Sequence, residues 1–193
     1  VPRGNTNSAL NEQWDGSSWT ETGDLNTARR AGFSSQKGTV TATIVSSGNH
    51  PGIGNTESWD GSSWTEVGDV NTGREAGSDI GIQTSAMFAG GIGNITNNEI
   101  WDGTSWTESA EINTGRHYVG SGGNDSTLGF IGGGNTTTAV ANTEVWNGSS
   151  WTEVADMATA RFMAGQTGGS APSGMFAGGY STAAVATVEE WTA

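Results

Sequence analysis

One segment is written four times along this chain, and each copy places two tryptophans on either side of a short polar turn. The copies are Trp14–Glu21, Trp59–Glu66, Trp101–Glu108 and Trp146–Glu153, and a truncated fifth copy covers 190–193. The leading tryptophans, counted from Trp14 to Trp191, lie 45, 42, 45 and 45 residues apart. A fixed period in this range is typical of a propeller, a solenoid or another repeat array. The repeat therefore constrains the architecture more tightly than the function.

The composition favours one all-β domain. Each unit of about 45 residues is too small to form a core alone, so we expect the units to share a single domain over residues 8–193. The chain has 32 glycines, which is typical of disordered segments, but nine regularly spaced tryptophans supply apolar surface that a linker does not need. Residues 1–7 are kept apart, because Val1-Pro-Arg-Gly4 resembles the remnant of a protease site used in recombinant expression.

Charge and residue content exclude several classes of function. The 20 acidic and 7 basic residues give a formal charge of −13, which disfavours nucleic acids and anionic membranes as partners. The chain has no cysteine, so disulfides, thiolate metal sites and cysteine nucleophiles are excluded. No apolar stretch approaches the roughly 20 residues of a membrane span. We expect no membrane insertion, no bound metal and no cofactor.

Within one unit, the pattern predicts four short strands. In the second unit these are a small-residue strand in 75–82, an apolar strand in 84–91, and two alternating strands joined by an Asp-Gly turn in 98–108. A glycine pair closes the second strand, where a positive backbone angle is expected. We place these pairs at Gly90–Gly91, Gly132–Gly133 and Gly178–Gly179, with Ser46–Ser47 as a departure in the first unit.

Three kinds of residue recur at fixed places in these units. An arginine opens each first strand: Arg29, Arg74, Arg116 and Arg161. A glutamate stands two residues before a tryptophan on each third strand: Glu57, Glu99, Glu144 and Glu189, with Trp59, Trp101, Trp146 and Trp191. A second tryptophan stands on each fourth strand: Trp64, Trp106 and Trp151, with Trp14 and Trp19 as an additional hairpin. Together with the glycine pairs, this pattern resembles the kelch repeat, a four-stranded blade of a β-propeller.

The resemblance implies a four-bladed β-propeller, and the strand count suggests how it would close. We assign the blades to 29–73, 74–115, 116–160, and 161–193 completed by 8–28, so that N- and C-terminal strands pair in the last blade. One third strand is left over. Either 188–193 is the surplus strand, or it pairs and residues 11–15 are displaced. A monomeric ring is favoured, with an oligomer through the surplus strand as the alternative.

The candidate binding residues have structural alternatives. The four arginines could ring the channel mouth as a site for an anionic ligand, although we favour pairing with glutamates that hold the blades in register. The tryptophans could stack on sugars, although their strict spacing favours blade interfaces. Non-repeated aromatic residues in the loops, namely His50, Tyr118 and Tyr180, are better candidates for carbohydrate contact.

A second resemblance concerns the biological setting. The wording of the repeat, Trp-Asn/Asp-Gly-Ser-Ser-Trp-Thr-Glu followed by Asn-Thr-Gly/Ala-Arg, is similar to repetitive proteins of marine bacteriophages that are assigned to tail fibres or virion surfaces. It implies a non-enzymatic structural or binding module, extracellular or on a virion, contacting host-surface glycans or other virion proteins. The alternatives are a secreted bacterial adhesion module and, less favoured, a glycan-processing enzyme in which Asp79 or Asp125 would act.

Overall fold

The structure is a computed structural model that describes residues 7–48, 52–170 and 173–192. Within these residues the chain forms seventeen strands in five antiparallel sheets, and no helix capable of crossing a membrane occurs among them. The strands are β1 (Glu12–Trp14), β2 (Trp19–Glu21), β3 (Phe33–Ser34), β4 (Thr43–Ser46), β5 (Thr56–Trp59), β6 (Trp64–Val67), β7 (Ile80–Ile82), β8 (Ser85–Ala89), β9 (Asn98–Trp101), β10 (Trp106–Ser109), β11 (Gly120–Asp125), β12 (Leu128–Gly132), β13 (Thr143–Trp146), β14 (Trp151–Val154), β15 (Gly165–Ser170), β16 (Ser173–Ala177) and β17 (Val188–Thr192).

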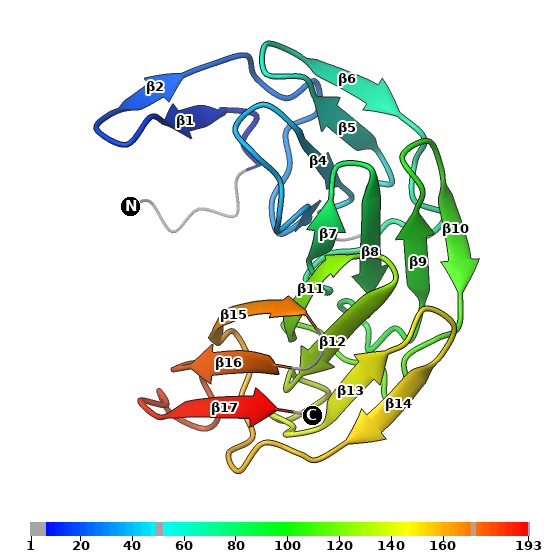
Figure 1. Ribbon diagram of the computed structural model, residues 1–193, viewed down its shortest axis with the longest axis vertical. Helices are drawn as coiled ribbons and strands as arrows, with labels where there is room; N and C mark the ends of the chain where they lie inside the picture. Colours follow the sequence, from blue (N-terminus) through cyan, green and yellow to red (C-terminus); the bar gives the residue numbers. More distant parts are fainter. Residues whose placement is uncertain (1–6, 49–51, 171–172, 193) are drawn as a thin grey trace.

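The sheets follow one another along the chain in a propeller-like arrangement. Three are complete four-stranded meanders, β3–β6, β7–β10 and β11–β14. They are preceded by the β1–β2 pair, here called the N-terminal hairpin, and followed by β15–β17, here called the C-terminal sheet. The complete sheets stand around a common axis, with strands such as β7 and β11 inside and β6, β10 and β14 outside (Figure 1). The all-β class and the sheet-by-sheet repeat are thus as predicted.

The Asp-Gly-Ser segments form the turns between third and fourth strands. In the first copy, Asp15 accepts hydrogen bonds from the backbone N–H groups of Ser17 and Ser18, both at 2.8 Å, and from the Ser17 hydroxyl. These bonds lower the pKa of Asp15 to about 2. Gly16 has a φ of 100°, which a residue with a side chain rarely adopts. The same turn recurs at Asp60, Asp102 and Asn147, so these residues satisfy local backbone groups.

Paired tryptophans fill the space between neighbouring sheets. Within each hairpin the two rings lie 5.2–5.5 Å apart at a tilt of 41–45°. Trp101 and Trp106 join Phe33, Ile44 and Phe88 in one buried cluster, which bridges the β3–β6 and β7–β10 sheets. Trp146 and Trp151 join a second cluster between the β7–β10 and β11–β14 sheets. The hydrophobic core therefore lies at the interfaces between sheets, because no single sheet can bury both of its faces.

Small residues on the inner strands let the sheets approach closely. A Cβ atom added to Gly120 would lie 2.0 Å from the ring of Phe176, which belongs to the next sheet. Gly174 is packed in the same way against Phe130, and the two phenylalanine rings meet edge to face at 5.8 Å. Alternating glycine and phenylalanine across this interface explains why the first strands are poor in large side chains.

The bend after the second strand is present in all four units, but two of the predicted positions were wrong by one residue. The pairs with positive φ are Ser47–Gly48, Gly90–Gly91, Gly133–Gly134 and Gly178–Gly179. The first unit therefore departs from the glycine pair at one position only. Ser47 stands in place of the first glycine with a φ of 59°, and Gly48 is the second glycine. Ser47 is held there because its hydroxyl bonds the backbone of Arg74 in the next sheet.

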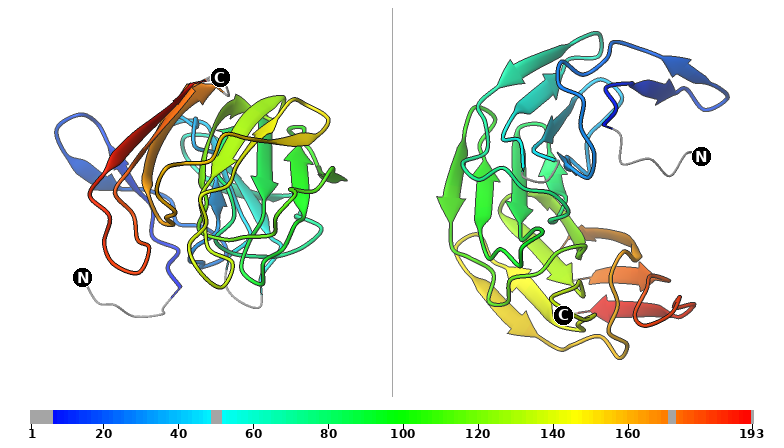
Figure 2. Two further views of the ribbon diagram at one scale, coloured as in Figure 1. Left: turned by 90° about the horizontal axis from the view of Figure 1, so that it is seen from below. Right: turned by 180° about the vertical axis from the view of Figure 1, so that it is seen from behind.

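The expected pairing of N- and C-terminal strands is not formed among the described residues. β17 pairs with β16 over five residues and takes the third position of the C-terminal sheet, as in the second predicted arrangement, but β2 does not join that sheet as its fourth strand, so the ring closure is not observed. The N-terminal hairpin pairs only within itself. Figures 1 and 2 show the hairpin and the C-terminal sheet at the two ends of an open arc. The third position holds one strand, so β17 and β1 cannot both take it.

Candidate functional site

Each repeated arginine forms a buried ion pair with the glutamate of its own sheet. We call the glutamate together with the groups that bond its carboxylate a carboxylate cradle. The pairs are Arg29–Glu57 at 2.6 Å, Arg74–Glu99 at 2.5 Å, Arg116–Glu144 at 2.9 Å and Arg161–Glu189. The arginines and the first three glutamates are buried, whereas Glu189 is partly exposed. The alternative in which arginines pair with glutamates is therefore what the structure shows.

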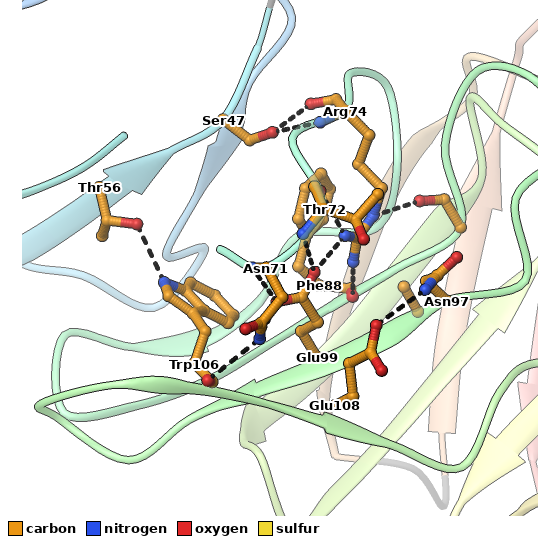
Figure 3. A network of polar contacts seen from close by, with 12 residues as sticks. Ser47, Thr56, Asn71, Thr72, Arg74, Phe88, Asn97, Glu99, Trp106 and Glu108 are labelled. Atoms are coloured by element: carbon orange, nitrogen blue, oxygen red, sulfur yellow. Dashed lines mark hydrogen bonds and ion pairs between the residues drawn. The ribbon is translucent and has the colours of Figure 1, made fainter. Parts of the chain in front are cut away.

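The second cradle contains the most complete set of contacts (Figure 3). The Glu99 carboxylate accepts hydrogen bonds from the backbone N–H groups of Asn71 and Thr72 and from the Asn71 side chain. The Asn71 amide also donates to the carbonyl of Trp106 on β10. Arg74 donates in addition to the carbonyls of Thr72, Gly90 and Phe88. The Glu99 carboxylate thus connects the segment 71–74, here called the lead-in segment of the sheet, to the third strand. The Asn71 side chain connects the same segment to the fourth strand.

Hydrogen bonds keep the Glu57 carboxylate of the first cradle charged in spite of burial. Burial alone would raise the pKa of Glu57, but the hydrogen bonds from Asn26, Arg29 and Thr27 outweigh it, and the pKa is lowered. The last cradle differs, because Ala158 stands where the others have asparagine and supplies only its backbone N–H to Glu189. The third cradle is less saturated, since Nε and Nη2 of Arg116 have no partner among the described residues.

Side chains that differ between copies lie directly after the cradle arginines. The first following residue is Arg30, Glu75, His117 or Phe162, and the second is Ala31, Ala76, Tyr118 or Met163. All four residues at the second position have φ between 49° and 62°. Their backbones are linked in series, with Ala76 N–H bonding Ala31 O, Tyr118 N–H bonding Ala76 O, and Met163 N–H bonding Tyr118 O, at 2.7–3.1 Å. The backbone is thus uniform where the side chains vary.

Four aromatic side chains form a continuous row on this face, here called the aromatic row: His117, Tyr118, Phe162 and Tyr180. The rings of His117 and Tyr118 are 5.0 Å apart, those of Tyr118 and Phe162 are stacked at 6.3 Å and 27°, and those of Phe162 and Tyr180 meet at 5.5 Å. Tyr180 is 46% exposed. The backbones of Phe162 and Tyr180 bond each other in both directions at 2.9 Å, so the row has a fixed support.

The row borders a pocket of about 240 Å³ near the axis, here called the axial pocket. It is lined by Ala31, Gly32, Ala76, Gly77, Asp79, Tyr118, Val119, Met163, Ala164 and Gln166. Asp79 is the carboxylate of this lining. Burial raises the pKa of Asp79 to about 7, and the hydrogen bond from the Ser34 N–H at 3.1 Å offsets only part of that effect.

The structure brings together some of the predicted site residues and separates others. Tyr118 and Tyr180 belong to one row, although they do not touch directly. The cradle arginines are buried and are not among the described residues that line the axial pocket. His50 lies outside the described residues. Sequence reasoning missed Phe162, His117 and Met163, which could have been found as the non-repeated residues that follow a repeated arginine.

Comparison with known proteins gives no relative. No protein-family model matches the chain, and no curated protein is similar to it at a significant level. Within the described residues there is no group of three histidine or acidic side chains placed to hold a metal ion. The function is therefore argued from the geometry of the site.

Breaking one cradle is expected to destabilise the whole fold. Arg74→Met removes the partner of the buried Glu99 carboxylate, and an uncompensated buried charge costs about 3–5 kcal/mol. We expect that loss in the free energy of unfolding, measured by urea denaturation. The matched control is Glu108→Met in the same sheet, because Glu108 is exposed and its contact with Asn97 is an exposed hydrogen bond, and such surface substitutions change stability by about 0.5 kcal/mol or less. Equal effects of the two substitutions would contradict the assigned role of the cradle.

Asp79 is expected to make stability depend on pH in one window. Its pKa is about 7 in the folded protein and close to 3.8 when unfolded, so between these values the folded state binds more protons. The free energy of unfolding should therefore fall as pH rises from 4 to 7, relative to Asp79→Asn, and the difference should level off above pH 8.

The control for this experiment is Asp125→Asn. The Thr127 hydrogen bonds lower the pKa of Asp125, so its contribution is present above pH 4 and lost only below that value. Urea denaturation at pH 4, 5.5, 7 and 8.5 separates the two cases. A wild-type curve parallel to that of Asp79→Asn across this range would refute the raised pKa.

Proposed function

We propose that the protein is a non-enzymatic binding module that recognises carbohydrate on the face formed by the aromatic row and the axial pocket. The observation that carries the proposal is the location of the row. The residues that build the fold are repeated, whereas this face takes its aromatic side chains from positions at which the copies differ. Because variation there leaves the backbone unchanged, the face is free to be specialised for a ligand.

The chemistry of the face suits a sugar. Flat aromatic rings pack against the apolar faces of pyranose rings, and the tyrosine hydroxyls add polar contacts at the rim. The Asp79 carboxyl and the Gln166 amide supply acceptors and donors inside the axial pocket. The pocket of about 240 Å³ is smaller than the usual 300–1,000 Å³ of small-molecule sites. This favours recognition of one terminal sugar, with further contact along the row.

The proposed setting is a bacteriophage virion or tail fibre, where such a face would contact glycans of the host surface. This part rests on the resemblance of the repeat wording to phage proteins. Immunogold labelling of purified virions with antibodies against the chain tests it, and we expect labelling at the tail or the capsid surface. Label found only on the surface of uninfected bacteria would instead support an adhesion module of the host.

Loss of one ring from the row is expected to weaken carbohydrate binding. On a glycan array we expect a restricted set of glycans to bind, and Tyr118→Ala or Tyr180→Ala to lower the affinity at least tenfold, which corresponds to about 1.4 kcal/mol. Leu128→Ala is the matched control. Leu128 is exposed at the start of β12, whereas the aromatic row lies near the end of that strand, where His117 pairs with Asn135. No binding on the array, or equal binding by all variants, would argue against a carbohydrate site here.

The raised pKa of Asp79 favours one alternative, a glycan-processing enzyme with Asp79 as the proton donor. A hydrolase of the usual kind needs a second carboxylate close by, and Asp79 is the only carboxylate among the residues that line the axial pocket. Incubating the bound glycans with the protein distinguishes the two functions. Release of sugar that is lost in Asp79→Asn would establish the enzyme, and intact glycans support the binding module.

A further inference from the structure

Among the described residues, the two ends of the arc hold complementary parts of a sheet. The N-terminal hairpin has a third and a fourth strand without the first two, and the C-terminal sheet has the first three strands without a fourth. β1 and β17 carry the same pattern, Glu12-Gln-Trp14 and Glu189-Glu-Trp191. Both strands therefore fit the same place, the edge of β16 opposite β15, which β17 occupies here.

The inner edge of the hairpin lacks the strands that cover it elsewhere. Trp14 and Trp19 are 45% and 65% exposed, whereas Trp59, Trp101 and Trp146 are buried. In the complete sheets the indole N–H of the third-strand tryptophan donates to a carbonyl near the turn between the first two strands, at 2.8–3.0 Å. Trp14 has no such partner among the described residues, and a pocket of about 410 Å³ lies beside it. A first and second strand would complete this edge.

β17 is covered less well than the other third strands. Its first residue, Val188, is 57% exposed, whereas the residues at the same position in the complete sheets, Thr56, Asn98 and Thr143, are buried. Trp191 is only partly buried. The outer edge of β17 pairs with no strand in the described part of the chain. β17 therefore has fewer stabilising contacts beside β16 than β1 would have, because β1 is paired with a fourth strand, β2.

Charge restricts what can replace β17. The cradle of the C-terminal sheet offers Arg161 and the N–H groups of Ala158 and Thr159, which together require a carboxylate. Glu12 stands two residues before Trp14, as Glu189 stands before Trp191, and its carboxylate is exposed without a partner among the described residues. The hairpin would thus supply the required glutamate, and the exchange leaves no buried charge unpaired.

The hairpin is fixed to its own neighbouring sheet. The backbones of Ser8 and Arg29 bond each other at 2.9 and 3.2 Å, and the side-chain amide of Gln13 donates to Val40 O at 2.8 Å. These contacts hold the hairpin at the far end of the arc from β16 (Figures 1 and 2). Reaching β16 of the same chain would require these bonds to break, whereas reaching β16 of another molecule would not.

We infer that the partner of this surface is a second copy of the chain. The N-terminal hairpin of each copy takes the place of β17 beside β16 of the other, giving two joint sheets of the order β15–β16–β1–β2. The two copies together then hold eight sheets, of which six are complete within one chain and two are joint. The contact is the same on both copies, so the assembly closes as a two-fold dimer. This inference is argued from the strand edges and the Arg161 cradle alone, so it does not depend on the proposed carbohydrate binding.

A pair of cysteines tests the exchange, since the chain has none of its own. Met175 faces Glu190 in the β16–β17 register, and Gln13 is the residue of β1 that matches Glu190. In the variant Gln13→Cys with Met175→Cys, we expect mild oxidation to give a disulfide-linked species of twice the 19.8 kDa chain mass on a non-reducing gel.

Two matched variants control this experiment. Thr20→Cys with Met175→Cys should not cross-link, because Thr20 faces Gln13 from the next strand and is one strand further from β16. Glu190→Cys with Met175→Cys should link β17 to its own sheet and prevent dimer formation. A disulfide within a single chain of the Gln13→Cys variant would show a four-bladed ring closed by one molecule, and absence of any disulfide would show no exchange. Either result overturns the proposal.

A second measurement does not depend on cysteines. Ending the chain after Thr187 vacates the place beside β16 and leaves Arg161 without Glu189. By sedimentation equilibrium we expect this variant to dimerise at least tenfold more tightly than the full chain. Adding Glu12→Gln to the truncated chain should reverse that gain, because the joint then lacks its carboxylate. A truncated chain that is folded and remains monomeric contradicts the exchange.

Discussion

The buried carboxylate on the third strand of each complete sheet is the interaction on which the rest of the structure depends. Glu99 is reached at once by the arginine and the two backbone N–H groups of its lead-in segment, and the asparagine of that segment continues to the fourth strand. A buried carboxylate without its partners is costly, so all these segments have to be in register before Glu99 is satisfied. The tryptophans then add apolar area between sheets, but it is the carboxylate that specifies which segments meet.

This division explains what could be predicted from the sequence. The strand order within a sheet, the Asp-Gly turns and the pairing of Arg29 with Glu57 follow from patterns inside one unit, and all are observed. The bend was misplaced by one residue in two units. In the first, Ser47 occupies a left-handed position that is usually left to glycine, and a hydrogen bond to the neighbouring sheet compensates; in the third, glycine fills all of 132–134, so the sequence does not show which two residues bend. Sequence spacing does not show such a contact.

Ring closure and the aromatic row were beyond the sequence for a different reason. β1 and β17 both carry a glutamate two residues before a tryptophan, so no local pattern decides which of them pairs with β16; the outcome depends on where the two ends of the arc stand. The row joins Tyr118 to Phe162, forty-four residues apart, through ring contacts that exist only once the sheets are packed. What the sequence did contain was the variation itself, since the residues after Arg116 and Arg161 differ from those after Arg29 and Arg74.

Open sheet edges are a liability, and the residues of β17 limit it. An uncovered β16 would present unpaired backbone groups to any extended segment, which is how edge-to-edge aggregation begins. β17 covers that edge of β16 and exposes the acidic Glu190 next to the cradle glutamate. A competing strand therefore has to supply a carboxylate to Arg161. The net charge of −13 opposes unspecific association of two copies. If only a matching hairpin can displace β17, exchange between two copies is reciprocal and pairs the end strands of both. Such exchange favours a closed dimer over an open chain of molecules.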